Sequence, residues 1–161
     1  RLPSLVVAAT LLAGCGTAQA LCTIVCSCSV SASPLSFGAH NPIAVGPTDS
    51  ATPIKVDCGG VAGLAIPYRV DLSKGSGSYA ARSLKSGSNV LAYNLYVDNA
   101  RLQVWGDGTA GTQSASGGFA LDLLGLAPSQ TLWVYGRIPS GQTSAVPGAY
   151  ADTITVTLTY Y

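Results

Sequence analysis

The last twelve residues of the chain, 150–161, alternate strictly between apolar and polar side chains. The apolar set is Ile154, Val156, Leu158 and Tyr160, and threonines occupy the positions between them. Successive side chains of a β-strand point to opposite faces, so this pattern predicts a half-buried strand. A long terminal strand leaves a row of unpaired N–H and C=O groups at its edge, which soluble proteins normally cover. We therefore expect a second polypeptide to pair with this strand.

Shorter runs of the same alternation occur earlier in the chain. They predict strands at residues 28–35, 54–58, 65–72, 91–97 and 132–138. Glycine, serine and proline separate the runs, with loops expected at 75–78, 106–118 and 140–148. The only helix-like stretch, 120–126, is too short to form a stable helix alone. Six or seven strands at this spacing predict an all-β antiparallel sandwich.

The first twenty residues are typical of an export signal. An apolar run at 5–13 follows Arg1, and Ala18-Gln19-Ala20 resembles a cleavage site. We expect the cut after Ala20. The run is shorter than the roughly 20 apolar residues that a membrane-spanning helix needs, so no transmembrane segment is expected in the mature chain.

Four of the five cysteines follow the expected cut: Cys22, Cys26, Cys28 and Cys58. Export favours disulfides, and the sequence alone does not choose among the three possible ways of forming two bridges. A zinc site at the first three is disfavoured because paired ligand spacing and a second cluster are missing. The fifth cysteine, Cys15, ends a Leu-Ala-Gly-Cys stretch that fits a bacterial lipobox, so a lipid anchor there is the alternative to cleavage after Ala20.

Charge is low and scattered along the chain. Without Arg1, seven Lys or Arg balance seven Asp, and Glu is absent. Nucleic-acid binding needs a basic patch, so it is not expected. The roughly 140 residues after the leader are enough for one domain with its own core.

The residue types that carry catalysis are not grouped in this sequence. His40 is the only histidine and has no nearby acid to orient it, so we interpret it as a turn residue. Asp98, Asp107 and Asp152 are expected to bond their own backbone at turns, and Trp105 to plug a turn. Nucleophile-elbow, phosphate-loop and dinucleotide motifs do not occur. We expect no enzyme activity, no metal and no cofactor.

Six motifs occur in a fixed order along residues 28–161. They are CSVSASPLSFG (28–38), Cys58, LAYNLY (91–96), WGDGT (105–109), VYGRIP (134–139) and GAYADT (148–153). In this order they resemble the spore coat protein U domain, a family that includes subunits of the archaic, Csu-type chaperone–usher pili. The domain then covers 28–161, and residues 21–27 form a short extension before it.

The resemblance implies an incomplete immunoglobulin-like sandwich whose last strand is supplied in trans. A periplasmic chaperone and then the N-terminal extension of a neighbouring subunit would provide that strand, by addition to an open sheet edge. The groove would be lined by Ile154, Val156, Leu158, Tyr160 and Tyr161, and basic chaperone residues would hold the terminal carboxylate. The outer-membrane usher and other pilus subunits would be further partners, and export would lead through the periplasm to the cell surface.

The resemblance also implies a disulfide between Cys28 and Cys58. A second pair, Cys22 with Cys26, is possible and would force a turn into the extension, because cysteines four residues apart in an extended chain are too far apart to bond. Leu21, Thr23 and Val25 form a possible donor segment, although seven residues span at most about 25 Å. A fibre tip, a terminator and a coat protein that does not polymerise therefore stay open as alternatives.

The expected function is a structural or adhesive pilus subunit that serves surface attachment and biofilm formation. The alternative from another class is a cell-surface carbohydrate-binding module. It would use the loop of Trp105 together with Trp133 and Tyr135, which the alternation places on the outer face of strand 132–138.

Overall fold

The computed structural model describes residues 26–161. The predicted leader, Cys15, Cys22 and the donor residues Leu21, Thr23 and Val25 lie outside the described residues. Within residues 26–161 there are eight strands and no helix. In chain order the strands are β1 (Ser27–Ala32), β2 (Thr48–Gly59), β3 (Ala65–Leu72), β4 (Arg82–Ser86), β5 (Asn89–Tyr96), β6 (Ala115–Ala120), β7 (Gln130–Ile138) and β8 (Val156–Tyr160).

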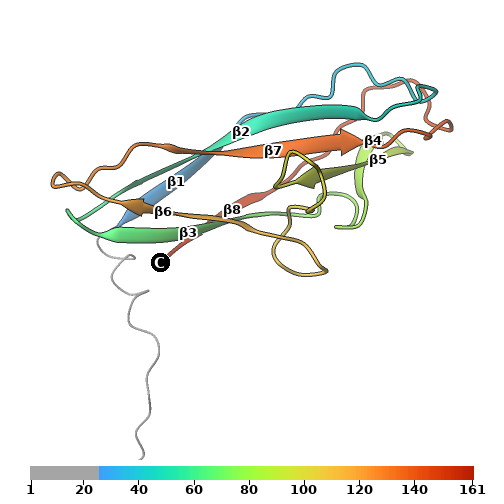
Figure 1. Cartoon of the computed structure of the whole chain (residues 1–161). Coiled ribbons are helices and arrows are strands. Elements are labelled where there is room, and N and C mark those ends of the chain that lie inside the picture. Colours follow the sequence, from blue (N-terminus) through green and yellow to red (C-terminus); the bar gives the residue numbers. More distant parts are fainter. Residues whose placement is uncertain (1–25) are drawn as a thin grey trace, which may run out of the picture.

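The strands form two sheets that pack face to face (Figure 1). One sheet has the order β1-β2-β7-β5-β4 and the other the order β6-β3-β8. Each pair of neighbouring strands is antiparallel. This is the all-β, immunoglobulin-like sandwich that the alternation and the resemblance predict.

The core lies between the sheets and is built from alternate positions of four long strands. It contains Ile54 and Val56 of β2, Ile66, Tyr68, Val70 and Leu72 of β3, Leu91, Tyr93 and Leu95 of β5, and Val134 and Ile138 of β7. Trp105 joins this core with 1% of its surface exposed, and its indole N–H donates to the Val70 carbonyl over 2.9 Å. The expectation of a buried turn plug is confirmed. A surface role for the Trp105 loop in sugar binding is therefore wrong, since the ring is inside.

The disulfide between Cys28 and Cys58 is present and joins directly opposed residues of β1 and β2. The pairing implied by the resemblance is confirmed. Cys26 is disulfide-bonded as well, and its expected partner Cys22 lies outside the described residues.

Two strands were not predicted. In β4 the inward position at its start is Arg82, which is fully buried, so the apolar signal of a strand is missing. The guanidinium is satisfied by the carbonyls of Ser73 and Trp105 and by Asn94 Oδ1, all within 2.6–3.0 Å. β6 falls in a stretch expected to be a loop. It carries Gly117, where a Cβ would lie 2.5 Å from the Tyr68 hydroxyl, so the large side chain of β3 requires a glycine opposite it.

The single strand predicted over residues 150–161 is wrong in extent. Residue Ala151 forms an isolated bridge with Lys85 of the five-stranded sheet, and β8 of the other sheet begins only at Val156. The chain therefore crosses between the two sheets over residues 152–155. Asp152 supports this crossing, because its Oδ1 accepts hydrogen bonds from the backbone N–H groups of Ser76 and Thr153.

Candidate functional site

The edge of β8 that faces away from β3 has no partner strand among residues 26–161. The Thr155 carbonyl accepts a hydrogen bond from the Ser73 N–H, just after β3, and the Tyr161 N–H donates to the Pro67 carbonyl of β3, at 3.0 Å each. Both groups therefore face β3. Backbone groups of alternate residues point to opposite sides of a strand. The N–H and C=O groups of Val156, Leu158 and Tyr160 therefore point away from β3, along the open edge.

The apolar face of the terminal segment is only half covered. Ile154, Val156 and Leu158 pack against the core but are each partly exposed, although the alternation turns them inward. Leu35 and Phe37, on the segment that follows β1, are also partly exposed and pack against the same core. The terminal segment and the segment after β1 line a single hollow, to which Leu35, Phe37, Ile154 and Val156 contribute side chains.

This hollow is a groove of about 850 Å³. One wall is the segment 32–40, and the other consists of residues 145–148 and 150–152 together with Ile154 and Val156. The floor is formed by core residues of both sheets: Ile54, Leu72, Leu91, Tyr93, Leu95, Val134 and Ile138. The sandwich is thus open to its core beside the start of β8, on the side where residues 26–161 provide β8 with no neighbouring strand.

Of the predicted groove residues, only Ile154 and Val156 line the hollow. Leu158 and Tyr160 lie further along β8, and Tyr161 follows its end. Sequence reasoning missed the opposite wall, in which Leu35 and Phe37 take part. Their spacing of two residues, with serine between them, was the available signal.

A polar contact fixes the floor of the groove to the crossing segment. The Tyr93 hydroxyl donates to Asp152 Oδ2 over 2.7 Å, and the Tyr93 ring meets Phe37 edge to face with 5.9 Å between centroids. Burial, and then the neighbouring Asp152 carboxylate, raises the pKa of Tyr93. The phenol therefore stays protonated and holds Asp152 at the groove edge.

The other polar side chains considered in the sequence have local roles. His40 lines the groove, and its Nδ1 lies 2.8 Å from Thr48 Oγ1. Asp98 accepts hydrogen bonds from the N–H groups of Leu102 and Gln103, and Asp107 from Thr109, so the expectation of turn roles for them is confirmed. The described part of the chain contains no cluster of three metal-binding side chains.

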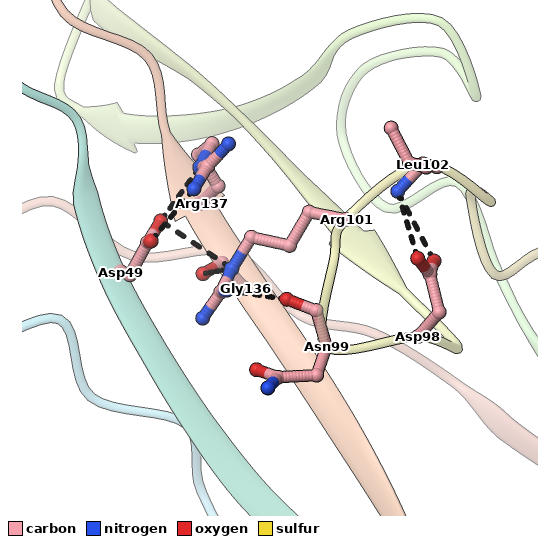
Figure 2. Close-up of polar contacts among 7 residues, drawn as sticks. All are labelled: Asp49, Asp98, Asn99, Arg101, Leu102, Gly136 and Arg137. Atoms are coloured by element: carbon pink, nitrogen blue, oxygen red, sulfur yellow. Dashed lines mark hydrogen bonds and ion pairs between the residues drawn. The ribbon is translucent and has the colours of Figure 1, made fainter.

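The outer face of the five-stranded sheet carries a charged network (Figure 2). Arg137 of β7 forms two hydrogen bonds to Asp49 of β2, at 2.7 and 2.8 Å. Arg101 reaches across from the loop after β5, with its Nε 3.4 Å from Asp49 Oδ1 and its guanidinium 5.8 Å from the centre of the Tyr135 ring. Tyr135 is therefore partly covered, and Trp133, 48% exposed, is the open aromatic side chain of this strand.

Comparison with known proteins gives two informative similarities. The chain is 32% identical over 137 residues to Protein U of Myxococcus xanthus, which covers 78% of this chain and 71% of that protein. Its structure superposes with a TM-score of 0.52 and 23% identity on a chain from a crystal structure of a chaperone–subunit complex. That complex is the CsuC–CsuE chaperone–tip adhesion subunit pre-assembly complex of the archaic chaperone–usher Csu pili of Acinetobacter baumannii.

The structural similarity covers 83% of this chain but 39% of the solved one, so it establishes a shared fold for one part of a longer protein. Among residues 26–161, no helix has the length and apolar character to cross a membrane. The sequence matches the family profile of the Spore Coat Protein U domain over residues 5–157, nearly its whole length. On this match and the identity to Protein U, the chain belongs to the Spore Coat Protein U domain family.

Proposed function

We propose that this protein is an exported, non-enzymatic subunit of a chaperone–usher pilus, and that its groove accepts a strand from another polypeptide. The observation that carries the proposal is the edge of β8 that residues 26–161 leave unpaired, beside an apolar groove of about 850 Å³. An exposed strand edge invites pairing with another chain. A protein that must stay soluble during export needs a partner on this edge at every stage.

The groove suits an extended segment with alternating side chains. The backbone groups of Val156, Leu158 and Tyr160 offer main-chain hydrogen bonds to it, and the apolar floor offers sites for every second side chain. Four apolar side chains buried there contribute roughly 6 to 12 kcal/mol before ordering costs. A contact of that strength can join subunits into a fibre.

The partners proposed are a periplasmic chaperone, which fills the groove first, an outer-membrane usher and other pilus subunits. The similarity to a chain from a chaperone–subunit complex supports the first of these. The destination is the cell surface, where the fibre serves attachment and biofilm formation. The proposed strand site comprises the terminal residues predicted from the alternation, of which Ile154 and Val156 line the groove, together with Leu35 and Phe37 of the opposite wall.

Point substitutions on β8, made in the exported full-length chain with a Csu-type chaperone co-expressed, test the proposal. Val156→Asp puts a charge into the groove, whereas Thr157→Asp puts the same charge on the exposed face of the same strand. We expect Val156→Asp to abolish chaperone co-purification and heat-labile, SDS-resistant ladders, and Thr157→Asp to retain both. Ladders of normal yield from Val156→Asp would show that the groove does not receive the strand.

A further inference from the structure

The inward-facing side chains of β2 change in character along the strand. From Ile54 onward they are apolar and belong to the core, whereas the inward positions 48, 50 and 52 carry threonine, serine and threonine. The change coincides with the end of β1, which pairs with residues 54–59 of β2. Beyond the end of β1 the chain continues as the groove wall 32–40. The inward hydroxyl groups of β2 therefore meet this wall, where the apolar residues further along meet the core.

Two of these hydroxyl groups hold the wall through its carbonyl groups. Thr52 Oγ1 lies 3.1 Å from the Ser33 carbonyl oxygen and 3.3 Å from that of Pro34, so its single proton is shared between them. Ser50 Oγ donates to the Ser36 carbonyl over 2.6 Å. Side chains of one strand thus bind three carbonyl groups of the neighbouring wall.

The wall has little other polar support in the described part of the chain. Residues 34–40 make no backbone–backbone hydrogen bond there, and the Ser33 N–H reaches the Pro53 carbonyl only at 3.4 Å. At the far end of the wall, His40 contacts the Thr48 hydroxyl. A strand inside a sheet is held by a ladder of main-chain bonds instead. The hydroxyl groups of β2 therefore supply most of the polar contacts that fix the wall.

Apolar packing seats the same wall over β7. Gly136 lies opposite Ser50 in the register of β2 and β7. A Cβ on Gly136 would lie 2.7 Å from Phe37 Cζ and 2.8 Å from Leu35 Cδ2, so the glycine leaves a notch that these two side chains fill. Leu35 and Phe37 are both partly exposed, so this packing alone is incomplete. The wall is seated in the notch and fixed by the hydroxyl groups beside it.

The two sides of the groove are therefore held with different strength. β8 is paired with β3 along its whole length. The wall 32–40 depends on side-chain hydrogen bonds and on partly exposed apolar contacts. Segments with few main-chain bonds and few buried contacts open locally at a lower free energy than paired strands. The wall is thus the side that yields first when a strand leaves the groove.

We propose that Ser50 and Thr52 are positioning residues of the groove, which hold the wall 32–40 against an inserted strand and thereby set how slowly that strand leaves. The inference rests on the proposed function, because it requires a strand in the groove. The two hydroxyl groups act through the wall, since their protons are engaged by its carbonyl groups.

Two substitutions of Thr52 separate its hydroxyl group from its size. Thr52→Val removes the hydroxyl and keeps the branched shape, whereas Thr52→Ser keeps the hydroxyl. The full-length chain is purified in complex with a co-expressed Csu-type chaperone, and release is followed as exchange into an excess of fluorescently labelled chaperone. We expect Thr52→Val to speed release roughly three- to tenfold and Thr52→Ser to change it less than about twofold, because one intramolecular hydrogen bond contributes about that factor. Ser50→Ala should speed release as well.

Thr112→Val is the matched control for a general loss of stability. Thr112 is as buried as Thr52, its hydroxyl donates to the Thr109 carbonyl over 2.7 Å, and it does not line the groove. Chemical denaturation of the chaperone-free variants should show that Thr112→Val and Thr52→Val are both less stable than the wild type. We expect Thr112→Val to release the chaperone at the wild-type rate, because its hydrogen bond lies outside the wall.

The outcomes distinguish this inference from the proposed function. Release from Thr52→Val at the wild-type rate, or equal acceleration by Thr112→Val or Thr52→Ser, overturns the positioning role and leaves the proposed function standing. Where Thr52→Val yields no complex, Ser50→Ala decides by the same criterion. A wild-type chain that forms no complex with the chaperone contradicts the proposed function, and the positioning role with it.

Discussion

The Tyr93 hydroxyl donates a hydrogen bond of 2.7 Å to Asp152 Oδ2, and this bond joins β5 of one sheet to the segment that crosses to the other. Tyr93→Phe removes the bond and leaves the ring. We expect a loss of about 1.5 to 3 kcal/mol in unfolding free energy, because the acceptor is a carboxylate. Chemical denaturation of the chaperone-free protein measures this difference in unfolding free energy. A difference below about 0.5 kcal/mol would show that the hydrogen bond from Tyr93 to Asp152 contributes little to stability.

The same variant has a distinct pH signature. The pKa of Tyr93 is raised by burial, so the folded state favours the neutral phenol. Its contribution is fully present below pH 10, the ordinary value, and is lost as the pH rises above it. The wild-type protein should therefore lose stability above about pH 10 more steeply than Tyr93→Phe. Equal alkaline slopes would contradict a buried, protonated Tyr93.

The buried Arg82 side chain ties three parts of the fold together, and within residues 26–161 its hydrogen-bond acceptors are carbonyl groups, none of them a carboxylate. Arg82→Met keeps a long side chain but leaves the Ser73 and Trp105 carbonyls and Asn94 without their donor. We expect a loss of more than about 3 kcal/mol, because each buried unpaired acceptor costs about 1 to 3 kcal/mol. Lys85→Met, an exposed change on the same strand, is the matched control and should stay within about 0.5 kcal/mol. Comparable thermal midpoints for the two variants would contradict the role given to Arg82.

Protonation of Asp49 should lower the stability of the protein at acid pH. Its hydrogen bonds with Arg137, helped by the charge of Arg101, lower the pKa of Asp49 from its ordinary value of 3.8 (Figure 2). Stability from this group is present above that value and is lost as the pH falls through the lowered pKa. Both partners are about one-third exposed, so Asp49→Asn should cost only about 0.5 to 1 kcal/mol at pH 7. Chemical denaturation of the wild type and of Asp49→Asn at pH 7 and at pH 3 measures this loss of unfolding free energy. A loss that is as large at pH 3 as at pH 7 would contradict a stabilising ion pair at Asp49.

Most of the sandwich could be predicted because its strands bury alternate apolar residues. β3 and β7 lie within or close to their predicted ranges for this reason. β4 could not be predicted because its buried residue is Arg82, whose charge is satisfied by distant carbonyls that only the fold brings together. β6 carries Gly117 at an inward position where a strand normally has an apolar residue, and the need for this glycine comes from Tyr68 on another strand.

The candidate site was predicted in part, from the terminal alternation alone. The pattern predicted that Ile154 and Val156 face the interior, and both line the groove. It did not reveal that the chain changes sheets before β8, because Thr153 and Thr155 preserve the alternation through the crossing. The wall that contains Leu35 and Phe37 could not be predicted in this way. It forms a groove only because the fold brings it opposite Ile154 and Val156, more than a hundred residues later in the chain, and no local sequence pattern shows that contact.

Amide hydrogen exchange on β8 tests the central claim most directly. In the free monomer the N–H groups of Thr157 and Thr159 face β3 and should be protected, whereas those of Val156, Leu158 and Tyr160 should exchange quickly. In the chaperone complex and in the assembled fibre, all five should be protected, because a strand from another polypeptide then lies on the open edge. Rapid exchange of Val156, Leu158 and Tyr160 in the complex and the fibre, or full protection in the free monomer, would contradict the claim that β8 receives a strand in trans.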